Sequence, residues 1–457
     1  MAEPKQVAVI GGGISGLACA YRLRQLGVAV TLFEGRDHPG GLIETHEKDG
    51  FLFESGPQSF QGISSVLALI HELGIEPDLC KAPPQAPRFI LRHGKLQKIP
   101  MSPQAVLTSS LLSAGARWNI ATEGFRSTKP PTEEESVAQF VRRKFGHEIL
   151  EYLVAPFVSG VYAGDPETLS LRAAFPSLEE WEQQYGSVVR GMIRSRSSGK
   201  ERTGPPPLCS FGRGVGTLTQ AIAGKLGASF QPGARTEAIE RTDSDRAPHY
   251  KVGLELAGKR ENALADAVVV ATPAHVASHL VAQFSPALGR TLSGIAYAGV
   301  AVVAAGYYVR QVNQPFDGFG VLIPRSEKYR TLGTVWNSSL FPGRAHEGQI
   351  AITSFIGGAT DPAILEESDD EIAAIVHAEN ARILGITGPP VATCVWKHPK
   401  ALPQYNLGHL HIVAAIREGE RATPGLFFAG NYVKGPSIPA CIDNGFQTAE
   451  AVKAYLQ

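Results

Sequence analysis

A glycine-rich turn near the amino terminus constrains the fold more than any other feature of the sequence. It follows a short apolar run, residues 7–10, that is typical of a buried parallel strand, and its glycines have the spacing G-x-G-x-x-G. A helical pattern over residues 17–26 comes next, and a second apolar run, residues 28–33, ends at Glu34. We therefore predict a βαβ unit that binds a dinucleotide, with the pyrophosphate at the helix amino terminus and Glu34 on the ribose hydroxyls. The residues predicted to bind in this turn are Gly11, Gly13, Ile14, Ser15 and Gly16.

Two further regions have the composition of cofactor-binding turns. One lies after Glu34 and contains a double glycine and then, behind another short strand, the run Gly-Pro-Gln-Ser. The other lies near the carboxyl terminus, where an apolar strand over residues 426–429 precedes a helix expected from about residue 441 to residue 456. A helix that starts just after a strand presents unpaired N–H groups to a ligand. The candidate cofactor-binding residues in these regions are Gly40, Gly41, Gly56, Pro57, Gln58, Ser59, Gly430, Ser437 and Ile438.

These motifs at both chain ends resemble those of the flavin-containing amine oxidase superfamily, which implies FAD as the cofactor. The resemblance also implies an α/β fold with three parts. The first is a discontinuous Rossmann-like FAD-binding domain, expected at residues 1–80, 205–290 and 415–457. The second is an α+β substrate domain at residues 291–414, and the third is a helical sub-domain at residues 85–204, which is compatible with membrane contact.

A more specific resemblance lies in residues 156–170, Pro-Phe-Val-Ser-Gly-Val-Tyr-Ala-Gly-Asp-Pro-Glu-Thr-Leu-Ser. This stretch is similar to a signature of the oxygen-dependent protoporphyrinogen oxidases, and residues 171–176, 318–324 and 332–339 support the likeness. The resemblance implies an oxidoreductase of haem biosynthesis that acts on CH-CH donors with O2 as acceptor. Protoporphyrinogen IX would be oxidised to protoporphyrin IX by removal of six electrons in three flavin cycles, with H2O2 as the second product. A tetrapyrrole and O2 are thus the expected partners.

The same resemblance implies a substrate-binding role for five residues. Arg88 matches the position of an arginine that pairs with a substrate propionate, and guanidinium geometry suits a carboxylate. Leu322, Val335 and Phe355 match apolar pocket walls, and Gly164 matches a position whose carbonyl faces the pyrroles. No catalytic acid or base is assigned, because hydride transfer to a flavin needs positioning more than proton transfer. No metal site is expected.

Three alternatives stay open. A coproporphyrinogen III oxidase that forms coproporphyrin shares the fold and most motifs, and its substrate has four carboxylates instead of two. An amine oxidase-like flavoenzyme is less favoured, since Tyr432 stands alone where that group often has an aromatic pair. A flavin- or porphyrin-binding protein without catalysis is the third alternative, motivated by the missing acid and base.

Composition limits the partners and the compartment. Lys plus Arg and Asp plus Glu both number 43, so no global field favours nucleic acid. Five scattered cysteines favour a reducing, cytoplasmic compartment. The apolar stretch over residues 297–309 is shorter than the roughly 20 residues that span a bilayer. We expect a cytoplasmic protein without a transit peptide, and the resemblance is compatible with peripheral contact at the inner membrane face and with a homodimer.

Four local patterns lie outside these motifs. Residues 212–216, Gly-Arg-Gly-Val-Gly, are not expected to bind a second nucleotide, because the preceding segment does not read as a buried strand. Residues 101–118 are the candidate for a single surface helix that meets a membrane. His409 and His411 are predicted to alternate on a strand, and His275 and His279 to lie on a surface helix.

Overall fold

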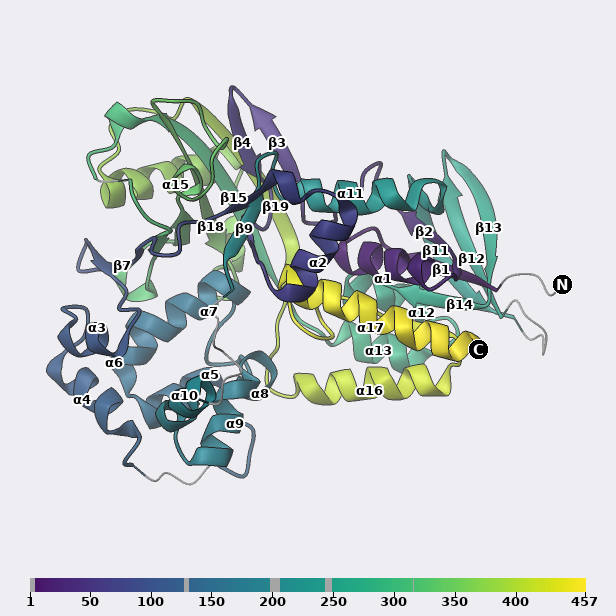
Figure 1. Ribbon diagram of the computed structural model, residues 1–457, viewed down its shortest axis with the longest axis horizontal. Helices are drawn as coiled ribbons and strands as arrows, with labels where there is room; N and C mark the ends of the chain where they lie inside the picture. Colours follow the sequence, from purple (N-terminus) through teal and green to yellow (C-terminus); the bar gives the residue numbers. More distant parts are fainter. Residues whose placement is uncertain (1–4, 127–130, 198–205, 243–248, 315) are drawn as a thin grey trace.

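The computed structural model has three regions (Figure 1). It describes residues 5–126, 131–197, 206–242, 249–314 and 316–457. A parallel sheet lies at the end of the molecule that carries both chain termini, and a seven-stranded sheet lies at the opposite end beside a group of helices (Figure 1). The predicted α/β class is therefore confirmed.

The parallel sheet has the strand order β10-β2-β1-β14-β20. Val7 and Val9 of β1 are buried in one hydrophobic layer, while Ala8 and Ile10 are buried in the layer on the other face. A parallel strand that is covered on both faces needs apolar residues at every position, which explains the uninterrupted run. The strands are β10 (Phe230–Pro232), β2 (Ala29–Glu34), β1 (Gln6–Ile10), β14 (Ala267–Val270) and β20 (Leu426–Phe428).

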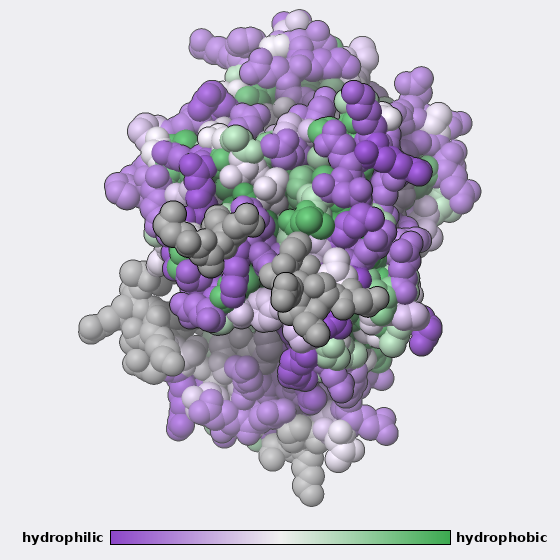
Figure 2. Space-filling model, turned by 90° about the vertical axis from the view of Figure 1, so that its right-hand side faces the viewer, coloured by the Kyte–Doolittle hydropathy of each residue, from purple (hydrophilic) through white to green (hydrophobic). Residues whose placement is uncertain are grey.

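Two different layers cover this sheet. Helices cover one face, and an antiparallel three-stranded sheet with further helices covers the other. The first layer contains α1 (Ile14–Gln25), α2 (Ser64–Leu73), α11 (Gly216–Leu226) and α17 (Ile438–Leu456). The second contains β11 (Ala234–Arg241), β12 (Tyr250–Leu256), β13 (Lys259–Ala265), α12 (Ala274–Val281), α13 (Pro286–Ser293) and α16 (His409–Ala422). Hydrophilic residues predominate on the outer surface of this end (Figure 2).

The second large sheet has the order β19-β15-β18-β17-β16-β7-β8. Its strands are β19 (Ala392–Pro403), β15 (Tyr297–Tyr308), β18 (Gln349–Gly357), β17 (Thr331–Val335), β16 (Gly320–Leu322), β7 (Arg88–Arg92) and β8 (Lys95–Lys98). Helix α15 (Asp369–Leu384) packs against one face of this sheet, where it covers Ala301 and Val303 of β15 and Ile356 of β18. The sequence prediction placed all of residues 85–204 in the helical sub-domain. Strands β7 and β8 lie instead in this sheet, because β7 pairs in parallel with β16, more than 200 residues away, a partner that local pattern does not reveal.

The helical region begins after β8. Residues 101–118 do not form the single predicted helix, because α3 ends at Thr108 and α4 starts only at Ala114, after a capping serine, Ser113. The elements here are α3 (Pro103–Thr108), α4 (Ala114–Glu123), α5 (Val137–Lys144), α6 (His147–Ile149), a π-helical turn (Leu150–Val154), α7 (Ala155–Tyr162), α8 (Leu171–Ala174), α9 (Pro176–Tyr185) and α10 (Val188–Ser197). Within the described residues, no helix is both long enough and apolar enough to cross a membrane.

Short elements connect the regions. They are β3 (Thr45–Lys48), β4 (Phe51–Glu54), β5 (Phe60–Gln61), β6 (Leu79–Lys81), β9 (Leu208–Phe211) and α14 (Asn337–Leu340). The predicted strand at His409 and His411 is wrong, because His409 begins helix α16 after Gly408, which has a positive φ of 86°. Two alternating histidines are too short a pattern to outweigh the helical period of the following residues. His275 and His279 lie on α12, as predicted.

Candidate cofactor and substrate site

The glycine loop lies at the carboxyl end of β1, between β2 and β14. A β-carbon at Gly16 would lie 2.0 Å from the carbonyl oxygen of Gly11, so helix α1 starts in close contact with the turn. Gly11 has a φ of 105° and faces the backbone of Ala271 and Thr272, just after β14. A residue with a side chain at either glycine would push the helix away from the sheet.

The start of α1 is free of side-chain caps. Gly13 occupies the N-cap without a side-chain hydrogen bond, and a β-carbon there would meet no atom within 4 Å. The first N–H groups of a helix have no partner within the helix. Open space in front of Ile14 and Ser15 therefore suits a pyrophosphate, so the residues present fit a dinucleotide cofactor.

Glu34 is held at the end of β2 by two backbone groups. Its Oε2 accepts a hydrogen bond from Gly12 N at 2.6 Å, and its Oε1 accepts one from Arg36 N at 2.8 Å. Gly40 N donates to Gly12 O at 2.9 Å, so the predicted double glycine packs directly on the glycine loop. The sequence-predicted residues on both sides of Glu34 are thus brought together.

The turn after β4 packs against Leu42, the residue that follows the double glycine. A β-carbon at Gly56 would lie 2.0 Å from Leu42 O, which is a close backbone approach. The side chain of Gln58, expected to face the cofactor, is engaged within the protein: its Nε2 donates to Gly56 O at 2.7 Å. Pro57 and Ser59, in the same turn, are partly exposed.

The carboxyl-terminal part of the site depends on Asn444, which the sequence analysis did not identify. Asn444 is buried in α17, and its Oδ1 accepts a hydrogen bond from Gly430 N at 2.8 Å, two residues after the end of β20. Helix α17 begins at Ile438 and not near Cys441 as expected, because Ser437 caps it by accepting from Ala440 N and because proline is tolerated in a first turn. The Ser437 hydroxyl therefore serves the helix.

The segment before residues 212–216 is a strand, so that part of the prediction is wrong. β9 is mostly buried and pairs with β5 and β6 in a small antiparallel sheet. The amino terminus of α11 is nevertheless already bound within the protein. Val215 N donates to Glu54 Oε1 at 2.9 Å, and Gly216 N donates to Thr45 Oγ1 at 3.1 Å. These two N–H groups are not available to a phosphate.

The four predicted substrate side chains lie on one face of the seven-stranded sheet. Gly320 is opposite both Arg88 and Val335, while Gly333 is opposite both Leu322 and Phe355. Directly opposed residues point to the same face, and so do residues two apart on a strand. We name these four residues the substrate face: Arg88, Leu322, Val335 and Phe355.

This face extends across the sheet to the cofactor turn. Val302 is opposite Phe355 and also opposite Trp396 of β19, two residues before His398. His398 Nε2 is 2.7 Å from Ser55 O, next to Gly56. Burial lowers the pKa of His398, the main cause of its shift. The sheet therefore joins the expected propionate end of the site to the turn that is predicted to bind the cofactor.

Helix α7 lies over the substrate face and carries part of the signature of residues 156–170. A β-carbon at Gly160 would lie 2.8 Å from Leu322 Cδ2, and Ala163 packs with Phe355. Gly164 follows Ala163, whose φ is 47°, and a β-carbon at Gly164 would lie 2.8 Å from Gln404 Oε1. All four substrate-face side chains remain partly exposed, unlike Val321 and Ile352 on the other face.

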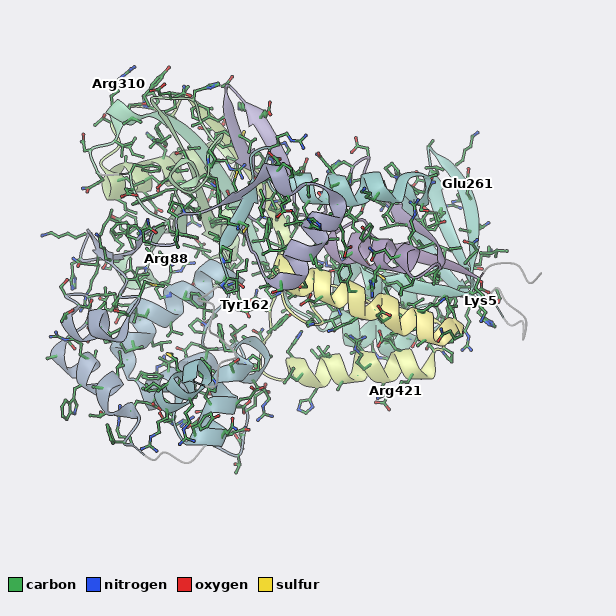
Figure 3. All side chains as sticks on the ribbon, viewed as in Figure 1. Lys5, Arg88, Tyr162, Glu261, Arg310 and Arg421 are labelled. Atoms are coloured by element: carbon green, nitrogen blue, oxygen red, sulfur yellow. The ribbon has the colours of Figure 1, made fainter. Side chains whose placement is uncertain are left out.

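Arg88 lies where the sheet meets the helical region, and Tyr162 lies nearer the parallel sheet (Figure 3). The Arg88 Cζ is 5.1 Å from the Phe319 ring centroid, and Arg88 has no ion-pair partner among the residues that the structure describes. A partly exposed cation on an apolar face suits a ligand carboxylate. In the described ranges, no group of three or more His, Cys, Asp or Glu residues could hold a metal.

The comparisons with known proteins agree with this geometry. The family model of flavin-containing amine oxidoreductases matches residues 14–453. Chloroplastic protoporphyrinogen oxidase 1 of Spinacia oleracea is 35% identical over 479 residues, covering 98% of this chain and 84% of that protein. Coproporphyrinogen III oxidase of Bacillus subtilis is 29% identical, covering 99% of this chain and 98% of that protein. A crystal structure of an Exiguobacterium sp. protein, provisionally assigned as a protoporphyrinogen oxidase, has a TM-score of 0.82 at 24% identity and 99% coverage of both chains.

The family model matches nearly the whole chain, and the family is flavin-containing. This agrees with the open space at the glycine loop. FAD is thus the cofactor of this protein, which is an oxidoreductase. The chain belongs to the family of flavin-containing amine oxidoreductases and, over nearly its whole length, is similar to the porphyrinogen oxidases.

Proposed function

We propose that the protein oxidises protoporphyrinogen IX to protoporphyrin IX with O2, as a step of haem biosynthesis. The observation that carries the proposal is the substrate face, which runs from a cation, Arg88, over apolar side chains to the turn at Gly56. The resemblance to chloroplastic protoporphyrinogen oxidases over 98% of the chain supports it.

The chain's own task in this reaction is positioning. Leu322, Val335 and Phe355 would contact the apolar disc of the substrate, and Arg88 would bind a propionate at its edge. Bound FAD supplies the two-electron acceptor, and O2 takes the electrons onward as H2O2. Removal of six electrons requires three such cycles. Helix α7, packed on Leu322 and Phe355, would keep water from the reacting carbon.

Coproporphyrinogen III is the alternative substrate, supported by the likeness to the Bacillus subtilis enzyme over 98% of that protein. Four carboxylates would require more cations than two. Arg92 lies on β7 four residues after Arg88, on the same side of the sheet as the substrate face, and its Nη1 is 3.0 Å from Glu148 Oε1. Because Glu148 already neutralises Arg92, the face favours the substrate with fewer carboxylates.

The deciding experiment follows porphyrin fluorescence in air with the purified flavoprotein and each porphyrinogen in turn. Faster oxidation of protoporphyrinogen, with about three H2O2 per porphyrin, would support the proposal, since three two-electron cycles are needed. Preference for coproporphyrinogen would replace it with the alternative. Failure of both substrates to bleach the flavin anaerobically would favour an amine oxidase-like activity or a binding protein without catalysis.

A peripheral membrane contact through the helical region is also proposed. Met101, Trp118 and Phe125 are 67%, 69% and 84% exposed, and large exposed apolar side chains are typical of contact surfaces. Flotation with anionic lipid vesicles would test this contact. Binding that is lost in Trp118→Ser with Phe125→Ser would support it, and absence of binding by the unmodified protein would overturn it.

A further inference from the structure

The last residue of β4 and the turn that follows it are held by three side chains from the seven-stranded half of the molecule. Arg344 Nη1 is 2.9 Å from Glu54 Oε1, and both side chains are almost fully buried. His398 contacts Ser55 O, and Asn337 contacts Gln58. The cofactor-binding turn is thus fixed from the substrate side as well as by its own strand.

The contact between Asn337 and Gln58 determines the orientation of an amide. Asn337 Nδ2 donates to Gln58 Oε1 at 2.7 Å, and the two residues are 3% and 6% exposed. With its oxygen held by Asn337, Gln58 points its Nε2 at Gly56 O, 2.7 Å away, and at Glu54 O, 3.3 Å away. Rotation of the amide by half a turn would place oxygen against oxygen, which is unfavourable in a buried site.

The position of Gly56 matters for the cofactor because of its close contact with Leu42 O. Leu42 follows the double glycine, and Gly40 is hydrogen-bonded to the glycine loop through Gly12 O. A shift of the Gly56 turn therefore displaces the segment that borders the open space in front of α1.

We propose that Asn337 is a positioning residue for the bound flavin and acts through Gln58. Asn337 is the first residue of α14, two positions after Val335 of the substrate face. Its side chain therefore connects the substrate face with the cofactor-binding turn. The inference concerns the binding of FAD alone, so it does not depend on which porphyrinogen is the substrate. A negative result for Asn337 would therefore leave the proposed function untouched, and the reverse is also true.

The test uses Asn337→Asp in the full-length protein. Aspartate keeps the shape of asparagine, but its carboxylate cannot donate to Gln58 Oε1. The control is Asn380→Asp: Asn380 is also buried, and its Nδ2 donates to Ser354 Oγ at 2.9 Å while its Oδ1 accepts from Thr334. Thr334 and Ser354 point to the α15 side of the sheet, away from the cofactor.

Three quantities are measured: the Kd of the apoprotein for FAD, the visible circular dichroism of the bound flavin, and the unfolding midpoint. Loss of one net hydrogen bond corresponds to a roughly threefold to tenfold increase in Kd. We expect Asn337→Asp to show this increase with an altered flavin dichroism, and Asn380→Asp to lower only the unfolding midpoint. In Gln58→Ala, adding Asn337→Asp should cause no further loss of FAD affinity.

Unchanged FAD affinity and dichroism in Asn337→Asp would overturn the proposal and leave the contact a purely structural one. If Asn337→Asp does not fold, Asn337→Ser replaces it, because a serine hydroxyl is too short to reach Gln58. The same increase in the Kd for FAD is then expected, and a Kd equal to that of the unmodified protein would equally overturn the proposal.

Discussion

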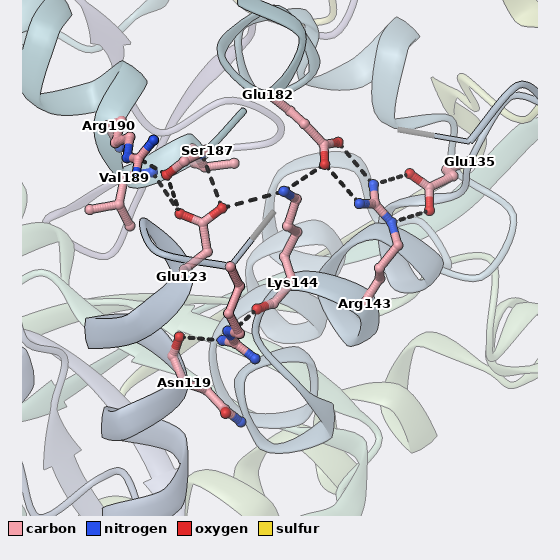
Figure 4. A network of polar contacts seen from close by, with 11 residues as sticks. Asn119, Glu123, Glu135, Arg143, Lys144, Glu182, Ser187, Val189 and Arg190 are labelled. Atoms are coloured by element: carbon pink, nitrogen blue, oxygen red, sulfur yellow. Dashed lines mark hydrogen bonds and ion pairs between the residues drawn. The ribbon is translucent and has the colours of Figure 1, made fainter. Parts of the chain in front are cut away.

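Lys144 Nζ lies 2.6 Å from Glu182 Oε1 in an ion pair whose two side chains are each only 2% exposed. Glu123 Oε1 lies 3.5 Å from the same ammonium group. Arg143 binds both Glu182 and Glu135, and Glu123 also accepts a hydrogen bond from Val188 N at the start of α10 (Figure 4). This network joins α4, α5, α9 and α10 in the region below the substrate face.

Replacement of Lys144 by methionine is expected to lower the free energy of unfolding by about 3–5 kcal/mol, because it leaves two buried carboxylates without their shared cation. Urea unfolding of the purified protein measures the change. Lys98→Met, at an exposed position of β8, is the matched control and should change stability by less than about 1 kcal/mol. Equal stability of the two variants would contradict the prediction.

The same network predicts a loss of stability in acid. Burial raises the pKa of Glu182, but hydrogen bonds from Arg143 and Lys144 and their charges outweigh it, so the pKa lies below its ordinary value. A carboxylate with a lowered folded-state pKa contributes stability above its unfolded pKa of about 4.3, and this contribution is lost as the pH falls further. Glu182→Gln should be less stable at pH 7 and lose less stability between pH 5 and pH 3. A parallel pH dependence in the variant would refute this assignment.

Two glycines of the same motif are expected to respond differently to alanine. At Gly13 a β-carbon meets no atom within 4 Å, so Gly13→Ala should fold normally while intruding on the space for the pyrophosphate. At Gly16 a β-carbon would lie 2.0 Å from Gly11 O, so Gly16→Ala should destabilise the apoprotein itself. Unfolding of the apoproteins and FAD titration separate the two effects. A stable Gly16→Ala apoprotein with normal FAD affinity would show that α1 can move away from the turn.

The sequence predicted the glycine loop and Glu34 because all their determinants lie within one βαβ unit of about 30 residues. The start of α17 was misplaced by three residues, since Ser437 caps the helix and Pro439 fits in its first turn. β9 was missed because prolines precede it and it has only four residues.

The residues that join the cofactor turn to the sheet were beyond sequence reasoning for another reason. Gln58 and Asn337 are 279 positions apart in the sequence. The motif around Gly430 does not reveal that Asn444, inside the long helix α17, accepts the hydrogen bond from Gly430 N. Such pairs are determined by tertiary packing and not by local period. The burial of Arg344 and of Asn337 becomes visible only in the structure, so the sequence carried no signal for these contacts.

Arg88 provides the sharpest test of the proposed binding of a porphyrinogen. Arg88→Ala should lower kcat/KM for the porphyrinogen roughly tenfold to a hundredfold, as expected for loss of a charged hydrogen bond, chiefly through a higher KM. Arg88→Lys should recover part of the loss, because lysine keeps the charge without the bidentate geometry. Arg310→Ala is the control, since Arg310 stacks on Tyr308 at the far margin of the sheet (Figure 3).

A substrate whose propionates are esterified tests the same contact from the ligand side. With this ester, kcat/KM of the unmodified protein should fall to the value of Arg88→Ala, and Arg88→Ala should have the same kcat/KM for ester and acid. If Arg88→Ala still prefers the free acid by the same factor, another cation binds the propionate and Arg88 has only a packing role against Phe319.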